Sequence, residues 1–334
     1  MSDSKDEKPI LSIEGLKTVF ALDEGSAVAV DRIDLHIARA ETVALVGESG
    51  CGKTAAALSI LRLLPVPPGK IEQGRILFKG NDLLSMPMKA LRKIRGNRIS
   101  MVFQEPMTSL NPVMCVGGQV AEVYRLHLGM SRAEALRAAE GMLDRVGISE
   151  PGMRMQEFPH QLSGGMKQRI MISMALACKP DLLIADEPTT AVDVTVQAQL
   201  LSLLKTCRDD FGMSILLISH DLSVVAELAD RVYIMYASRI VETARTLALH
   251  RQPLHPYTAG LFRSLPGLNA GGQRLMEIPG SVPDPLCFPA GCRFHPRCDR
   301  RGRQCETEEP CLRELSEGRW VACHFPLNET ETVR

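Results

Sequence analysis

The feature that most constrains the fold is a phosphate-binding signature held between a strand and a helix. The apolar run at residues 42–46 leads straight into a glycine-rich octapeptide, and an alanine-rich helical stretch follows. This is the G-x-x-x-x-G-K-[ST] pattern in the context that it requires. It predicts a loop whose backbone N–H groups surround a phosphate at the positive end of a helix. The octapeptide consists of Gly47, Glu48, Ser49, Gly50, Cys51, Gly52, Lys53 and Thr54.

Two residues of this loop have predicted chemical roles. Lys53 is expected to reach the β- and γ-phosphates of a nucleotide, and Thr54 to bind Mg²⁺. The alternative is a chance match in a glycine-rich turn. At ordinary glycine usage such a match arises in roughly one chain of this size in a hundred, and the flanking strand and helix make it rarer.

A second apolar run ends in two carboxylates. Residues 182–185 are followed by Asp186 and Glu187. Ligand groups in a parallel α/β sheet lie at the carboxyl ends of the strands. The pattern therefore predicts Asp186 as a Mg²⁺ partner and Glu187 as a base or orienting group for an attacking water. A solvated acidic turn would be the favoured interpretation of this segment alone, but not beside a phosphate-binding loop.

A third motif opens another helix. Ser163, Gly164 and Gly165 precede a helical run, so their side chain and amides form a second anion-binding helix N-terminus. One nucleotide does not need two such sites in one subunit. We therefore expect this loop to close over a nucleotide held by another subunit. A simple helix cap is the alternative.

Alternating strands and helices predict βαβ units around a largely parallel sheet up to about residue 250. Between residues 106 and 160 the pattern becomes helical, and Ser131 with Glu134 forms a capping box for a helix over 131–146. Proline, glycine and cysteine become frequent after about Pro253. We therefore expect an α/β domain over 1–252, with a helical insertion at about 106–160, and a small irregular extension over 253–334. Strands are expected at 42–46, 99–103, 182–185, 214–218 and 232–235.

Composition excludes several classes of protein. With 45% hydrophobic and 23% charged residues among 334, the chain is not intrinsically disordered. Its 39 basic and 39 acidic side chains count against a nucleic-acid binder that relies on a broad basic surface. No N-terminal signal and no apolar window of about 18 residues is apparent. We expect a cytosolic chain that does not itself span a bilayer.

The extension carries a cluster of cysteines. Four of them are separated by 5, 6 and 17 residues in a segment with few large apolar side chains. A bound metal centre would supply folding free energy that such a segment lacks. The spacing matches neither the common zinc pattern nor that of ferredoxins, so zinc, an iron–sulfur cluster and free thiols all stay open. The four are Cys292, Cys298, Cys305 and Cys323, with Cys287 and Cys311 as spare candidates.

The order of these motifs resembles the ATP-binding subunits of ABC transporters. The resemblance implies a P-loop NTPase cassette with a RecA-like α/β core. It also implies that Gln104 links nucleotide and Mg²⁺ to the helical insertion, that His220 contacts the γ-phosphate, and that Asp193 lies at a dimer interface. Phe20 would stack on the adenine, or it is a buried core residue. The matching elements are the octapeptide 47–54, Gln104, the segment 162–169, the segment 182–187 and His220.

The extension resembles that of oligopeptide, dipeptide and nickel importer ATPases, through residues 253–258, 278–283 and 291–298. Residues 104–112 match the same subfamily. The resemblance implies an ATPase that uses ATP and Mg²⁺ to import peptides or similar small solutes, peripheral on the cytoplasmic face of the inner membrane. The implied partners are a second ATPase subunit, expected to be a paralogue, two permease subunits and an extracytoplasmic solute-binding protein. Some such ATPases carry a [4Fe–4S] cluster, which favours that cofactor.

Two other functions compete with import. One is a soluble ABC ATPase that acts as a switch on nucleic acid or ribosomes, and the other is a redox-sensing regulator. The chain has one cassette, no heptad run and no basic tract, which argues against the first.

Because the cassette has its own motifs and core, we expect ATP binding to survive loss of a metal centre in the extension.

Overall fold

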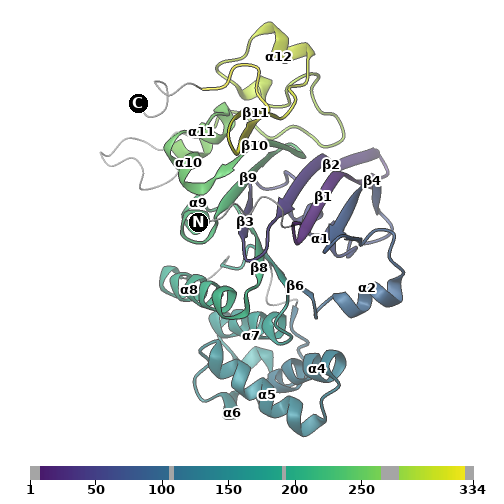
Figure 1. Ribbon diagram of the computed structural model, residues 1–334, viewed down its shortest axis with the longest axis vertical. Helices are drawn as coiled ribbons and strands as arrows, with labels where there is room; N and C mark the ends of the chain where they lie inside the picture. Colours follow the sequence, from purple (N-terminus) through teal and green to yellow (C-terminus); the bar gives the residue numbers. More distant parts are fainter. Residues whose placement is uncertain (1–7, 105–108, 190–192, 265–277, 328–334) are drawn as a thin grey trace. The chain divides into compact units, whose positions relative to one another are not determined.

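The computed structural model describes residues 8–104, 109–189, 193–264 and 278–327, which form two compact units. Figure 1 shows the elements in chain order. The first unit comprises residues 1–10, 38–41 and 85–217, and the second comprises 11–37, 42–84 and 218–334. The chain passes from the first unit to the second within strand β8 (Ser214–Ser219).

The first unit combines parallel strands with helices. Strand β6 (Ile99–Val102) pairs in parallel with β7 (Leu182–Asp186), with Ile99 opposite Leu182. Every residue of β7 is buried, as expected for a strand covered on both faces. The helices are α2 (Met88–Ile94), α4 (Val116–Leu128), α5 (Arg132–Arg145), α6 (Pro151–Arg154), α7 (Gly164–Leu176), α8 (Val194–Phe211) and the 3₁₀ turn η1 (Pro159–Gln161).

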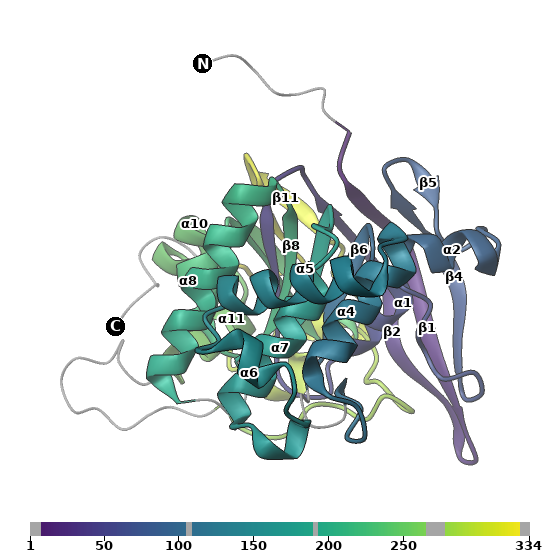
Figure 2. The same ribbon diagram turned by 90° about the horizontal axis from the view of Figure 1, so that it is seen from below.

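The predicted helical insertion is present. Helices α4 to α7 gather in one group in both Figure 1 and Figure 2. Ser131 caps α5 by accepting a hydrogen bond from the Glu134 backbone N–H, and the Glu134 carboxylate accepts from the Ser131 N–H. The capping box read from the sequence is therefore confirmed. Residues 105–108 lie outside the described part of the chain.

The second unit contains an antiparallel sheet and a second group of paired strands. The antiparallel sheet has the order β2-β1-β4-β5, with β1 (Leu11–Leu22), β2 (Gly25–Ile37), β4 (Gly69–Phe78) and β5 (Asn81–Asp82). Strand β3 (Thr42–Val46) pairs in parallel with β9 (Arg231–Tyr236), and β10 (Arg239–Arg245) adds to β9 antiparallel. Helices α1 (Lys53–Ile60), α9 (Leu222–Leu228), α10 (Thr246–Arg251) and α11 (Pro256–Arg263) complete this part.

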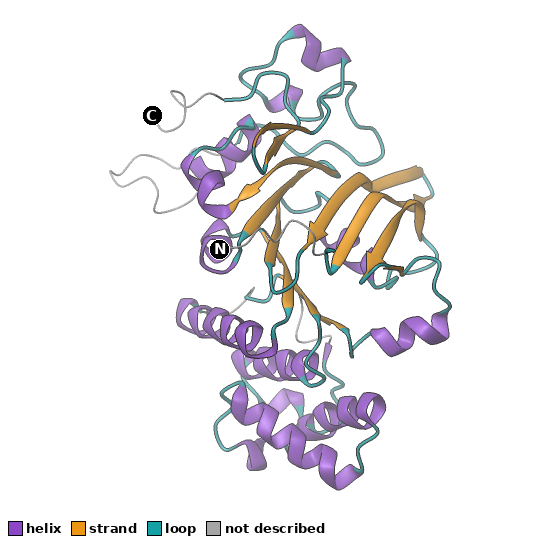
Figure 3. Ribbon diagram, in the orientation of Figure 1, coloured by secondary structure: helices purple, strands orange, loops and turns teal. Residues whose placement is uncertain are grey.

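The C-terminal extension joins this sheet. Most of residues 278–327 are loop (Figure 3), with a 3₁₀ turn η2 (His295–Arg297) and a short helix α12 (Arg303–Thr307). The hairpin of β11 (Arg313–Ser316) and β12 (Arg319–Val321) then pairs with β10, with Val321 opposite Glu242. Hydrogen bonding of this hairpin to β10 therefore orders a segment that has little apolar core of its own. The predicted domain boundary near residue 253 stays a prediction.

A buried carboxylate anchors the start of the extension. Glu242 of β10 is fully buried and accepts hydrogen bonds of 2.8 Å from the backbone N–H groups of Leu254 and His255. Burial raises the pKa of its carboxyl group above the ordinary value. The carboxylate thus supplies acceptors for two N–H groups at the entry to α11.

None of the helices in the described ranges has the length and apolarity that crossing a membrane requires.

Replacing Glu242 with alanine is expected to destabilise the second unit by about 2–4 kcal/mol, because two buried N–H groups lose their acceptor. Thermal unfolding followed by circular dichroism measures the loss. The exposed Glu317→Ala substitution is the control. Equal melting temperatures for the two variants would contradict the anchoring role.

Candidate functional site

The phosphate-binding loop lies between β3 and α1 in the second unit. A Cβ atom on Gly47 would lie 2.1 Å from the Met235 carbonyl oxygen, and one on Gly52 would lie 1.9 Å from that of Ala29. Gly52 also has φ +108°, which side chains rarely adopt. Only glycine fits these two positions. The sequence pattern thus reflects backbone packing as well as phosphate binding.

Lys53 is the cation at the centre of this loop. Its side chain is buried, and its ammonium group donates hydrogen bonds to the carbonyl oxygens of Gly47 at 2.7 Å and Glu48 at 3.0 Å. Ser49 and Thr54 are exposed, so the open side of the loop is accessible. The arrangement can receive an anion on backbone N–H groups, a helix N-terminus and one lysine. Cys51 is buried, and burial raises the pKa of its thiol.

The predicted carboxylates lie at the end of β7 in the first unit. Asp186 is buried, and Glu187 is half-buried with φ +47°. A positive φ in a residue other than glycine is uncommon and recurs at functional sites. The Gln104 side-chain amide donates a 3.1 Å hydrogen bond to the Glu187 carboxylate. The fold thus brings together two predicted site residues that are 83 positions apart.

The predicted second anion-binding motif begins α7. The Ser163 hydroxyl accepts a hydrogen bond from the Met166 backbone N–H and caps the helix. Ser163 and Gly164 are exposed, and Gly165 is half-buried. The motif therefore caps a helix and also presents its first turn to solvent. Asp193 caps α8 in the same way, by accepting from Val196 at 2.9 Å, and residues 190–192 lie outside the described ranges.

Two further predicted residues lie in the second unit. His220 follows β8 and is exposed. Phe20 is half-buried in β1, opposite Ala27 of β2 and Gly69 of β4. Their predicted contacts with the γ-phosphate and the adenine stay predictions.

A groove on the first unit has a volume of about 220 Å³. Three methionines and the exposed Phe103 give it an adaptable apolar wall. Phe103 directly precedes Gln104 in the sequence. The groove is lined by Gly96, Ser100, Met101, Phe103, Ser109, Val123, His127, Met171, Met174 and Ala175.

The four predicted cysteines of the extension line one small cavity, which also includes His255 and Phe294. Burial raises the pKa of the Cys292 thiol to about 11 and that of Cys323 to about 12. In the described ranges, no three histidine, cysteine, aspartate or glutamate side chains are grouped so that they could hold a metal ion. The spare candidates, Cys287 and Cys311, are exposed. The four predicted cysteines therefore line one cavity, but the side chains of the described ranges do not form a metal site.

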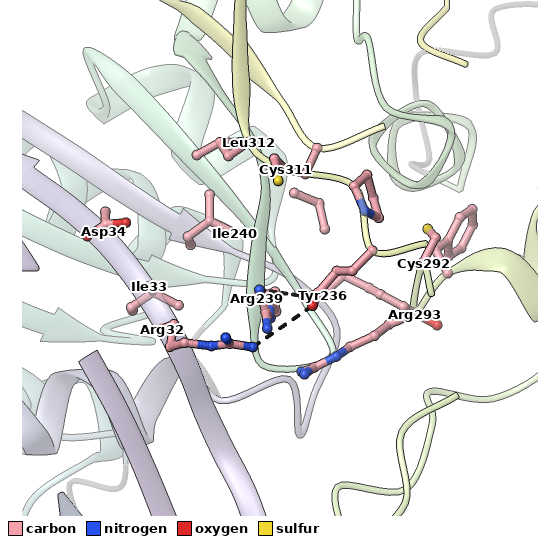
Figure 4. Close-up of a pocket in the computed structure, with 15 residues that line it drawn as sticks. Arg32, Ile33, Asp34, Tyr236, Arg239, Ile240, Cys292, Arg293, Cys311 and Leu312 are labelled. Atoms are coloured by element: carbon pink, nitrogen blue, oxygen red, sulfur yellow. Dashed lines mark ion pairs between the residues drawn. The ribbon is translucent and has the colours of Figure 1, made fainter. Parts of the chain in front are cut away.

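A second cavity, of about 390 Å³, lies where β2, β10 and the extension meet (Figure 4). Arg239 forms an ion pair of 2.7 Å with Glu309, and Arg32 approaches the same carboxylate at 3.9 Å. Arg293 and Arg239 both pair with Asp31 of β2. These charges neutralise one another and join the extension to the cassette strands.

Sequence reasoning missed two residues that contact the phosphate-binding loop. They are Tyr257 and Arg297, both of which hydrogen bond to Glu48. Each lies in a segment on which the resemblance to importer ATPases rests. That resemblance was the only available signal, because nothing in residue type or spacing links these positions to a loop more than 200 residues away.

Comparisons with known proteins agree with this arrangement. Residues 30–190 match the ABC transporter family, and residues 241–305 match the oligopeptide/dipeptide transporter C-terminal region. The oligopeptide transport ATP-binding protein AppD of Bacillus subtilis is 50% identical over 314 residues, with 94% of this chain and 96% of AppD covered. A protein of Brucella abortus named for peptide import ATP binding is 49% identical over 327 residues, covering 95% and 97%.

Among solved structures, the dimeric ATP-binding cassette MJ0796 bound to ADP and phosphate is similar, with a TM-score of 0.64 at 25% identity. The match covers 71% of this chain and 98% of that one.

Replacing Lys53 with alanine is expected to weaken ATP binding about 10- to 100-fold, because the substitution removes the charge-assisted hydrogen bonds to the phosphates. Equilibrium binding of labelled ATP at physiological salt measures the affinity. Lys70→Ala, on the exposed side of β4, is the matched control. Unchanged affinity in the Lys53 variant would refute the assignment of the loop.

Proposed function

The chain belongs to the ABC transporter ATP-binding subunits that carry the oligopeptide/dipeptide transporter C-terminal region, and we propose that it hydrolyses ATP to energise import of peptides or similar small solutes. The predicted family and fold class are confirmed. One observation carries the proposal: a phosphate-binding loop and a peptide-transporter extension occur together in a chain that matches peptide-transport relatives over nearly its whole length. Copurification of permease subunits with the tagged chain tests it.

The catalytic roles follow from the chemistry of each group. Backbone N–H groups of the loop and Lys53 bind the phosphates of ATP. Thr54 and Asp186 offer the hard oxygen ligands that Mg²⁺ prefers, and the ion would neutralise charge on the β- and γ-phosphates. Glu187 accepts a proton from, or orients, the attacking water, and His220 contacts the γ-phosphate. Most of the acceleration comes from positioning and charge neutralisation.

Gln104 couples the reaction to transport. Its hydrogen bond to Glu187 fixes the carboxylate, and its neighbour Phe103 lines the methionine groove of the first unit. A methionine-lined groove can adapt to an apolar partner helix. We assign this groove to a permease subunit. Two permeases and an extracytoplasmic solute-binding protein complete the importer, and the ATPase is peripheral on the cytoplasmic face of the inner membrane.

The exposed cap of α7 points to a second ATPase subunit. Ser163 and Gly164 present N–H groups and a hydroxyl to solvent. In the proposed mechanism they close over the nucleotide of the partner, with Asp193 at the same interface, and Phe20 stacks on the adenine. We propose a paralogue as the partner. The alternative of a soluble switch on nucleic acid or ribosomes, and that of a redox regulator, are disfavoured by the peptide-transporter C-terminal region.

The cysteine cluster is proposed as the site of a [4Fe–4S] centre. Four thiols line one cavity, yet no three of the described metal-binding side chains are grouped for a single ion. Four thiolates suit an iron–sulfur cluster or zinc, and the resemblance to importer ATPases favours the cluster. A cluster would also deprotonate the thiols, whose pKa values are raised when they are buried alone.

Replacing Glu187 with glutamine is expected to slow ATP hydrolysis about 10²- to 10⁴-fold while ATP still binds, because the base or orienting group is lost and the phosphate loop is intact. Phosphate release from the assembled importer measures turnover, and sedimentation with ATP detects the trapped closed dimer. Glu227→Gln, on the exposed side of α9, is the control. Wild-type turnover would remove Glu187 from this role.

Protein purified without oxygen is expected to be brown, with about four irons and four sulfides per chain. Single serine substitutions of the four cavity cysteines should remove the colour, whereas Cys287→Ser and Cys311→Ser, both exposed in the structure, should not. Metal analysis and visible absorption provide the measurement. Stoichiometric zinc without iron, or a colourless native protein, would contradict the cluster.

A further inference from the structure

Glu48, the second residue of the phosphate-binding loop, is bound by two residues that lie beyond the cassette motifs in the sequence. They are Tyr257 and Arg297. The Tyr257 hydroxyl accepts a 2.9 Å hydrogen bond from the Glu48 backbone N–H. The Arg297 guanidinium binds the Glu48 carboxylate twice, from Nη1 to Oε2 at 2.7 Å and from Nη2 to Oε1 at 3.0 Å. This parallel geometry is the strongest form of an arginine–carboxylate pair. Both the backbone and the side chain of Glu48 are therefore held by residues that follow the cassette motifs in the sequence.

The Arg297 side chain is itself held in place. Its Nε donates to the Pro279 carbonyl oxygen at 2.9 Å, and Nη2 donates to that of Ile278 at 3.2 Å. The side chain is 5% exposed, against 28% for Glu48. Hydrogen bonding to Glu48 raises the pKa of the guanidinium still further, so it stays charged. Arg297 is thus a preorganised cation rather than a mobile surface charge.

The charge of Glu48 matters because the loop binds a polyanion. Glu48 sits between Gly47 and the exposed Ser49, on the turn whose N–H groups receive phosphate. An unpaired carboxylate there repels ATP, and a pair with arginine removes that repulsion. The bidentate pair also fixes the Glu48 side chain on this turn.

We propose that Arg297 is a positioning residue for ATP: it neutralises and holds the loop carboxylate Glu48 without contacting the nucleotide itself. The inference rests on the proposed function, because it requires that the loop bind ATP. Arg297 immediately precedes Cys298, so the order of the cysteine segment is transmitted to the phosphate-binding loop through one side chain. The expectation that ATP binding survives loss of a metal centre in the extension stays a prediction.

The test measures binding of labelled ATP to the purified full chain, with Mg²⁺. Arg297→Gln is expected to weaken binding about tenfold at low salt, the scale of one lost charge-assisted pair. Concentrated salt should shrink this loss, because screening weakens the repulsion from the unpaired carboxylate. In the assembled importer the same variant should raise KM and leave kcat nearly unchanged. Arg301→Gln, at an exposed arginine of the same segment, is the control and should behave as wild type.

The decisive comparison is a double-mutant cycle with Glu48→Gln. That variant removes the carboxylate, so adding Arg297→Gln to it should cost nothing more than Glu48→Gln alone. A folding defect of Arg297→Gln would persist in the Glu48→Gln background, so the cycle separates such a defect from loss of the pair. The proposal is overturned by a tenfold loss that persists in the Glu48→Gln background, or by wild-type affinity in Arg297→Gln. A wild-type chain that binds no ATP would overturn the proposed function as well.

Discussion

Close backbone packing around the phosphate-binding loop is the constraint on which the second unit depends. At Gly47 and Gly52 the loop approaches the carbonyl groups of Met235 and Ala29 so closely that no side chain fits. Met235 belongs to β9 and Ala29 to β2, so the loop is shaped by both sheets of this unit. The Ser238 backbone N–H also donates a 3.0 Å hydrogen bond to the Cys51 carbonyl oxygen. An anion site made of N–H groups has a defined shape only because these neighbours fix it.

The extension continues this constraint. Its last hairpin adds to β10, and an aromatic cluster packs Phe294 against Tyr236 and Tyr257, with ring centroids 5.2 and 5.5 Å apart. Aromatic pairs at such separations stabilise packing beyond their buried area. Tyr257 then reaches the Glu48 N–H from this cluster. The cassette and the segment that follows it therefore share one packed core within the second unit.

The features that the sequence predicted correctly are those that depend on residues close together in the chain. The five predicted strands lie within two residues of the observed ones, because each is an apolar run bounded by turns. The cap at Ser131 and the glycines of the loop were readable for the same reason. What could not be read are the partners of Glu48 and Asp31, since ion pairs between residues more than 200 positions apart leave no periodicity. The Gln104–Glu187 hydrogen bond likewise needed the fold, although Glu187 was predicted from its strand and Gln104 from the family resemblance.

Buried charges help to hold the extension on the cassette strands. Burial of the Asp31 carboxyl group acts to raise its pKa, but the guanidinium groups of Arg239 and Arg293 outweigh it, so the pKa lies below the ordinary value. The pair with Arg239 lies within the cassette strands, and Arg293 completes it from the extension. Without Arg293 the buried Asp31 carboxylate keeps Arg239 but loses part of the positive charge that offsets its burial. Arg297, four residues after Arg293, binds Glu48, so two arginines of one short segment attach the extension to carboxylates of the cassette.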